Sequence, residues 1–191
     1  MSGSVLEKSR ENNHFLACIK LMPLLVIFSI LLSCNRTLPL QTVERVDLSR
    51  YSGKWYEIAA FPQRFQKDCF CTTAEYKPTG EGYISILNKC NKGSVDGPLD
   101  SATGKAFIDR GSGNAKLKVQ FFWPFKGKYW IIDLASDYSH AVVGHPNRDY
   151  LWILSRQPIM NASLYHSILT KLSTQGFDTN RLVKTIHRNE K

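Results

Sequence analysis

The chain is most informative at Gly53-Lys54-Trp55-Tyr56-Glu57-Ile58-Ala59. Glycine has no Cβ, so Gly53 permits a tight turn into the residues that follow it. Trp55 is the largest apolar side chain available to fill the space beneath a first strand. Residues 55–60 are rich in aromatic and apolar side chains, and they predict a β-strand. A Gly-x-Trp triplet is weak evidence alone, so its value depends on agreement with the rest of the chain.

Seven further runs have strand length and strand composition, and each is bounded by Gly, Pro, Asn or Asp. They are residues 72–77, 83–89, 104–109, 116–122, 129–135, 141–144 and 150–155. The clearest alternation is in the fourth of these runs, where Leu117, Val119 and Phe121 share one face and polar residues the other. Eight short strands with short connections predict an all-β fold, an eight-stranded up-and-down antiparallel barrel whose apolar face lines the interior.

One segment does not show the two-residue alternation of a β-strand. Apolar residues recur at helical spacing at Leu164, Ile168, Leu169 and Leu172. Asn161 is suited to cap the start of a helix and Gly176 to end it. We therefore expect an amphipathic C-terminal α-helix over residues 162–175, packed outside the barrel, followed by a last strand-like run at 182–186.

The first part of the chain is typical of an export signal. Lys20 provides a positive flank to the apolar residues 21–30, which are too few for a membrane span of about 20 residues. Leu31-Leu32-Ser33-Cys34 resembles a bacterial lipobox, in which cleavage exposes the cysteine for acylation, and Asn35 is typical of lipoproteins sent to the outer membrane. We expect a signal peptide at 1–33 with an unusually long start, a lipidated tether at 34–45 and a folded domain at 46–191. An ordinary signal peptide with an incidental cysteine is the alternative.

The formal net charge is +9, and nearly all of it lies in the expected mature chain. A basic surface held at a membrane suits anionic head groups or polyanionic envelope sugars. The basic residues are scattered rather than clustered, so solubility alone is the other explanation and no nucleic-acid partner is expected.

The cysteines indicate an oxidising compartment. With Cys34 acylated, Cys69, Cys71 and Cys90 allow one disulfide and leave one thiol. A hairpin of 72–77 and 83–89 carries Cys90 back towards both other cysteines, so the residues leave two pairings open. The Cys-x-Cys pair has no accompanying ligands at metal-site spacing, and no metal site is expected.

Three motifs in order make the chain resemble the lipocalins. They are residues 53–59, then Ser136-Asp137-Tyr138 followed by residues 140–143, and Tyr150-Leu151-Trp152-Ile153-Leu154-Ser155-Arg156. The chain resembles the bacterial outer-membrane lipocalin lipoproteins, and it is similar also to apolipoprotein D and plant temperature-induced lipocalins. The resemblance covers about residues 46–186, with Ser136 where threonine is usual and Ala60 where an arginine is frequent.

The resemblance implies roles for the signature residues. They are Gly53, Trp55, Asp137, Tyr138 and Arg156. In lipocalins the arginine lays its guanidinium on the tryptophan indole, a cation–π contact of about 0.5–2 kcal/mol that seals one end of the barrel. The resemblance also favours a Cys69–Cys90 disulfide, with Cys71 possible instead of Cys69.

The resemblance further implies a membrane-anchored protein that binds and stores or transports fatty acids and lysophospholipids, without a cofactor. Its location would be the bacterial outer membrane, facing the periplasm, and a homodimer is possible. We expect an apolar, aromatic ligand lining without a buried charge that could fix one polar ligand. Its residues are Phe107, Leu117, Val119, Phe121, Trp130, Ile132 and Trp152.

Three other functions are alternatives to lipid binding. A haem or tetrapyrrole carrier would need an axial ligand such as His140, which follows the second motif. An enzyme would need the leftover thiol of Cys69 or Cys71 beside a base, but the histidines are scattered, so catalysis is not expected. A purely structural envelope lipoprotein would fill its interior with large side chains and hold no ligand.

Overall fold

The computed structural model describes residues 38–188. The expected signal peptide and Cys34 therefore lie outside the described residues. The strands are β1 (Gly53–Ala60), β2 (Cys69–Pro78), β3 (Ile84–Lys92), β4 (Leu99–Ile108), β5 (Lys116–Gln120), β6 (Gly127–Leu134), β7 (His140–Gly144), β8 (Leu151–Ser155) and β9 (Val183–Lys184). The helices are α2 (Leu48–Tyr51) and α3 (Ala162–Thr174), with 3-10 turns η1 (Arg64–Gln66) and η2 (Thr179–Arg181).

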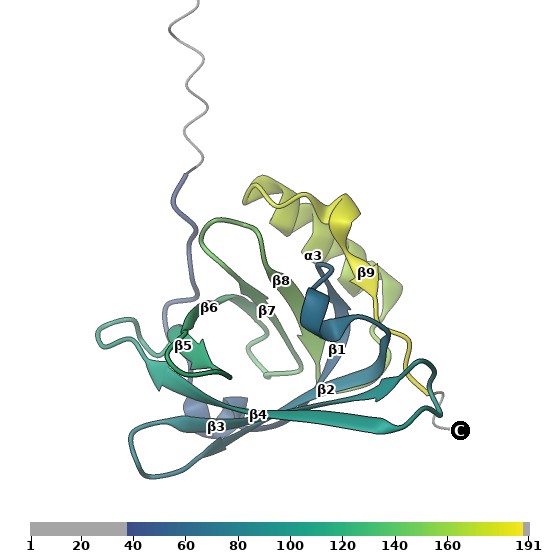
Figure 1. The fold of residues 1–191 in the computed structure, drawn as a ribbon. Helices are drawn as coiled ribbons and strands as arrows, with labels where there is room; N and C mark the ends of the chain where they lie inside the picture. Colours follow the sequence, from purple (N-terminus) through teal and green to yellow (C-terminus); the bar gives the residue numbers. More distant parts are fainter. Residues whose placement is uncertain (1–37, 189–191) are drawn as a thin grey trace, which may run out of the picture. The chain divides into compact units, whose positions relative to one another are not determined.

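Strands β1 to β8 form a closed antiparallel barrel (Figure 1). Each strand pairs with the next along the chain, and β1 also pairs with β8. Pairing of β1 with β2, from Gly53 opposite Tyr76 to Tyr56 opposite Thr73, closes the ring. The predicted eight-stranded up-and-down barrel is confirmed, since closure satisfies the strand edges that an open sheet would expose.

The barrel has two different ends. At one end α2 and the residues before it contact the β4–β5 and β6–β7 turns, where Val46 N donates to Gly113 O at 2.8 Å and Asp47 N to Tyr138 OH at 2.8 Å. We call this the α2 end. Because successive strands are antiparallel, the loops 61–68, 93–98, 121–126 and 145–150 all lie at the opposite end, which we call the rim.

Apolar side chains form two clusters, one on each face of the barrel wall. The fully buried residues of the inner cluster include Trp55, Ile131 and Val143. The outer cluster lies between the wall and α3, and Ile168 and Leu172 of α3 are buried in it together with Phe61. Burial of an apolar side chain of this size contributes about 1.5–3 kcal/mol, which holds α3 on the outside of the barrel as Figure 1 shows.

Helix α3 begins and ends as expected. The Asn161 side chain accepts hydrogen bonds from Ser163 N at 2.9 Å and Leu164 N at 3.2 Å, satisfying two amides that the first turn leaves free. Gly176 follows the helix with φ of +82°, a left-handed conformation that other residues adopt only with strain.

The C-terminal segment fills a gap in the barrel wall. Beyond Tyr56, β1 leaves β2 and pairs instead with β9, and Thr185 N donates to Ile58 O at 3.0 Å. On the other side Cys71 N donates to Ile186 O at 2.9 Å. Only Val183–Lys184 of the strand expected at 182–186 is regular, because the segment bridges two diverging strands rather than extending along one.

A disulfide joins Cys69 of β2 to Cys90 of β3, with 5.4 Å between the Cα atoms. It is the pairing that the resemblance favoured. Among the cysteines of residues 38–188, Cys71 is the free one, and its Sγ lies 3.9 Å from Val95 O of the β3–β4 loop. The β2–β3 pairing is irregular between Phe70 and Thr73, where Cys71 has a φ of 52°.

Candidate functional site

The α2 end of the barrel is closed by Arg156 and Trp55. The Arg156 guanidinium carbon lies 3.7 Å from the centre of the buried Trp55 ring. The same guanidinium donates to four carbonyl oxygens, those of Lys54 (2.7 Å), Arg50 (2.7 Å), Tyr51 (3.2 Å) and Ser52 (2.9 Å). These carbonyls include the ones that the end of α2 leaves free, so Arg156 ties α2 across the barrel end.

Asp137 and Tyr138 also make contacts within the protein at this end of the barrel. The Tyr138 hydroxyl accepts a hydrogen bond from Asp47 N, and the Arg50 guanidinium lies 4.0 Å from the Tyr138 ring centre. Asp137 Oδ1 accepts from Ser139 N at 2.9 Å, and this hydrogen bond lowers the pKa of the Asp137 carboxyl. Tyr138 thus holds the β6–β7 turn against α2, and Asp137 stabilises the turn itself, so both residues have structural roles.

Three buried tyrosines lie inside the barrel above this end. The Tyr129 hydroxyl lies 2.9 Å from the Tyr51 hydroxyl and 2.8 Å from that of Tyr76. Burial raises the pKa of all three, that of Tyr76 to about 12, so they are neutral and hydrogen-bonded near neutral pH. These tyrosines were not predicted from the sequence, although Tyr129 shares the inward face with Ile131, two residues further along β6.

Four of the seven expected lining residues belong to the inner face. Leu117 is buried in the inner cluster, while Val119, Phe121 and Trp152 are partly buried against it. Phe121 lies against the backbone of β4, since a Cβ on Gly104 would come 2.9 Å from its ring. Glycine at this position lets the ring approach the wall closely.

The other three expected lining residues face outward, which corrects the prediction. Trp130 and Ile132 pack with the outer cluster beneath α3. Strand β6 is apolar on both faces because one face meets the inner cluster and the other meets α3, so apolar character does not identify the inward face. The inward residues of β6 include Tyr129 and Ile131.

Phe107 is outward for a similar reason. Its neighbours Ala106 and Ile108 belong to the inner face, and successive strand residues point to opposite faces. The Phe107 ring lies 6.2 Å from the Tyr83 ring and 4.1 Å from Lys126 Nζ. Small Ala106 therefore occupies the inward position where a large aromatic residue was expected.

A buried carboxyl that the sequence did not predict lies beside the lining. Glu57 is 8% exposed and accepts hydrogen bonds from Thr185 Oγ1 at 2.6 Å and Gln66 Nε2 at 2.7 Å. Burial raises the pKa of Glu57, and the two hydrogen bonds oppose that shift. Gln66 Oε1 also accepts from Trp152 Nε1 at 3.4 Å, which connects the carboxyl to the lining.

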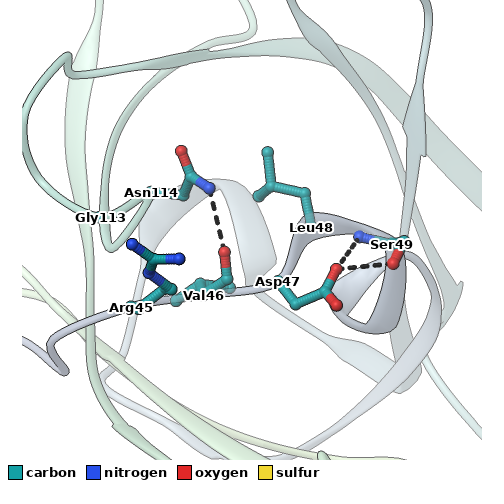
Figure 2. A pocket seen from close by; sticks show the side chains of 7 residues that line it. All are labelled: Arg45, Val46, Asp47, Leu48, Ser49, Gly113 and Asn114. Carbon is teal, nitrogen blue, oxygen red and sulfur yellow. Dashed lines mark hydrogen bonds between the residues drawn. The ribbon is translucent and has the colours of Figure 1, made fainter.

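A separate pocket lies at the α2 end (Figure 2). It is lined by Arg45, Val46, Asp47, Leu48, Ser49, Gly113 and Asn114. Its polar groups are used within the protein, since Asn114 Nδ2 donates to Val46 O at 3.0 Å and Asp47 Oδ1 accepts from Ser49 N at 2.9 Å (Figure 2). This pocket is therefore part of the end closure rather than of the inner lining.

Residues 38–188 contain no group of three side chains placed to hold a metal ion. Within the same residues, no helix has both the length and the apolar character needed to cross a bilayer. His140 shares the outward face of β7 with Val142, because Ala141 and Val143 belong to the inner cluster. It is therefore not placed to bind a ligand inside the barrel.

Comparison with known proteins agrees with this architecture. The family model described as a lipocalin-like domain matches residues 46–187. Outer membrane lipoprotein Blc of Vibrio cholerae is 38% identical over 162 residues, covering 83% of this chain and 94% of that protein. Temperature-induced lipocalin-1 of Arabidopsis thaliana is 38% identical over 154 residues, covering 76% and 82%.

Among solved structures, insecticyanin from the tobacco hornworm Manduca sexta has the same fold. Its TM-score is 0.63 at 23% identity, covering 78% of this chain and 85% of that one. The closed barrel, the arginine and tryptophan at its α2 end and the match over nearly all of the described residues lead to one conclusion. The chain belongs to the lipocalin family.

Proposed function

We propose that this lipocalin binds the hydrocarbon chains of fatty acids or lysophospholipids inside its barrel. The observation that carries the proposal is a gradient of exposure along the inner face. Trp55 and Ile131 are fully buried, whereas Val119, Phe121 and Trp152 are only partly buried although they face inward. Apolar side chains that face inward and stay partly exposed offer a surface for an apolar ligand.

The closed α2 end favours one orientation of the ligand. Arg156 and Trp55 close that end, so a charged head group placed there would lose its contact with water at a high free-energy cost. The head group is therefore expected at the rim, with the hydrocarbon tail directed towards the α2 end. Affinity should rise with chain length, by about 0.8 kcal/mol for each methylene buried.

The test is a titration of tryptophan fluorescence with saturated fatty acids of increasing length. Trp152→Phe should remove most of the response, while Trp130→Phe is the matched control because Trp130 packs beneath α3. A response that does not change with chain length, or one that Trp152→Phe leaves intact, would contradict the proposal. A haem absorption spectrum with higher affinity would favour a tetrapyrrole carrier instead.

We also propose that Cys34 carries a lipid anchor in the bacterial outer membrane. Support comes from Leu31-Leu32-Ser33-Cys34 and from relatives named outer membrane lipoprotein. One acyl chain binds a membrane only marginally, whereas two or more anchor a protein stably. Cys34→Ala should abolish incorporation of labelled palmitate, and Cys71→Ala is the control. Equal labelling of the Cys34→Ala variant and the wild type would show that the site is wrong.

The same arrangement supports binding rather than catalysis. The free thiol of Cys71 lies near the backbone carbonyl of Val95, whereas a thiol-based enzyme needs a base beside its nucleophile. We therefore propose a carrier or store of lipid that is not an enzyme. Rapid alkylation of Cys71 together with thiol-dependent turnover would contradict this assignment.

A further inference from the structure

The β5–β6 loop presents three aromatic side chains to solvent. Phe122 is 77% exposed, Trp123 87% and Phe125 76%. Phe125 N donates to Phe122 O at 2.9 Å, so the loop is a defined turn with the aromatic residues at its tip. Exposing three large rings on one turn is costly in water, and such groups mark a surface that meets another apolar phase.

The other rim loops share this character. Phe65 of η1, Leu99 at the start of β4 and Tyr150 before β8 are also exposed. Among residues 38–188, six of the ten exposed large apolar side chains thus lie on a rim loop or directly border one. Ile159, by contrast, is an exposed apolar residue that follows β8 at the α2 end. The apolar surface is therefore concentrated at one end of the barrel.

The charge of the same hairpin indicates the nature of the partner. Residues 116–130 contain four lysines and no aspartate or glutamate. Lys126 and Lys128 are exposed directly beside the aromatic turn. Aromatic rings accompanied by lysines are typical of segments that lie at the interface of a bilayer, where rings enter the head-group region and lysines meet anionic lipids.

The position of the described N-terminus agrees with contact at this end. Arg148 of the β7–β8 loop donates through Nη2 to Leu38 O at 2.6 Å, so Leu38 lies at the rim. Leu38 is only four positions after the proposed acylation site at Cys34. Four residues span at most about 14 Å, so an anchor at that site is attached to the chain close to the rim.

We propose that the rim of this lipocalin docks on an anionic lipid bilayer, with Phe122, Trp123 and Phe125 inserted among the head groups. Docking in this way turns the rim end of the inner face towards the lipid, so a ligand can pass between bilayer and barrel without crossing water. This goes beyond the proposed function, because a lipid carrier that is merely tethered needs no contact between its rim and the membrane.

The test uses the full lipidated chain in vesicles of equimolar phosphatidylethanolamine and phosphatidylglycerol carrying brominated acyl chains, which quench tryptophan on contact. Wild type is compared with Trp123→Phe, which keeps an aromatic ring but removes the reporter. We expect Trp123→Phe to remove at least half of the quenching that the bilayer causes. Equal quenching in the two proteins would overturn the proposal, because Trp123 then does not meet the lipid.

A second comparison tests the role of charge. Replacing Lys126 and Lys128 by glutamate should reduce the quenching of Trp123 at least two-fold in phosphatidylglycerol vesicles. The matched control is Lys77→Glu, an exposed lysine near the end of β2 at the α2 end. An equal effect of the control, or none from the double variant, would overturn the part played by anionic lipid.

Two tryptophans keep docking distinct from ligand binding. Soluble brominated fatty acid should quench Trp152 inside the barrel, and brominated bilayer should quench Trp123 at the rim. Loss of the first signal alone contradicts the proposed function, and loss of the second alone contradicts docking. If a protein in an envelope extract protects Trp123 from acrylamide while vesicles do not, the rim binds a protein and the proposal is wrong.

Discussion

Removal of the Arg156 guanidinium should destabilise the α2 end of the barrel. In Arg156→Ala the carbonyl oxygens of Arg50, Ser52 and Lys54 each lose a donor at 2.7–2.9 Å. Tyr51 O keeps a hydrogen bond from Trp55 Nε1 at 2.8 Å, so its loss is smaller. The cation–π contact with Trp55 is lost as well.

The magnitude follows from these contacts and from the partial exposure of Arg156. Each of the three hydrogen bonds contributes about 0.5–1 kcal/mol, because water can replace part of the lost donor. The cation–π contact adds about 0.5–1 kcal/mol at a partly exposed site. We therefore expect Arg156→Ala to lower the free energy of unfolding by about 2–4 kcal/mol. Arg156→Lys keeps the charge but not the forked donors, and we expect roughly half of that loss.

Urea unfolding followed by tryptophan fluorescence measures these differences. Arg110→Ala is the control, because Arg110 is exposed in the β4–β5 turn at the same end of the barrel. Its substitution should change the free energy of unfolding by less than about 0.5 kcal/mol. If Arg156→Ala is no more destabilising than Arg110→Ala, the guanidinium does not hold α2 in place and the reasoning is refuted.

Three further predictions concern other contacts. Reducing the Cys69–Cys90 disulfide, whose cysteines are 21 residues apart, should lower the free energy of unfolding by about 3 kcal/mol, measured by urea titration with and without reductant; equal midpoints would contradict this. The pKa of Glu57 is raised in the folded state, so protonated Glu57 contributes to the stability of the fold. This contribution is lost as pH rises through that pKa. Glu57→Gln should therefore gain stability over wild type towards neutral pH, and a difference in thermal midpoint independent of pH would refute this. Gly104→Ala should lower the free energy of unfolding by about 1–3 kcal/mol, because the added Cβ displaces the Phe121 ring. Gly127→Ala is the control, since its Cβ would make only an ordinary contact at 3.8 Å. Similar unfolding curves for the two variants would exclude the close approach of Phe121 to Gly104.

Local sequence determined the order and type of the secondary structure. Short runs of aromatic and apolar residues between turn formers predicted eight strands because each strand requires only its own composition and its own breaks. The helical spacing from Leu164 to Leu172, with Asn161 before it, predicted α3 for the same reason. The observed strands begin or end a few residues from the predicted ones, since pairing partners extend β2 and β4 beyond their most apolar parts.

Composition alone did not determine which strand face is inward. The alternation of β5 was informative because its outer face meets water, so Leu117 and Val119 were assigned to the interior where the structure places them. Strand β6 is apolar on both faces because α3 covers the outer one, and Trp130 and Ile132 were assigned to the wrong face. The position of α3 against the barrel wall depends on tertiary packing, and the pattern of residues within β6 does not reveal it.

The polar features of the interior were decided by tertiary structure alone. Glu57 becomes a buried carboxyl because Thr185, 128 residues further along the chain, reaches it from the C-terminal segment. Tyr51, Tyr76 and Tyr129 meet through their hydroxyls although they belong to three separate elements. Strand chemistry is local and can be predicted from sequence, whereas burial, pKa and polar pairing depend on residues that only barrel closure brings together.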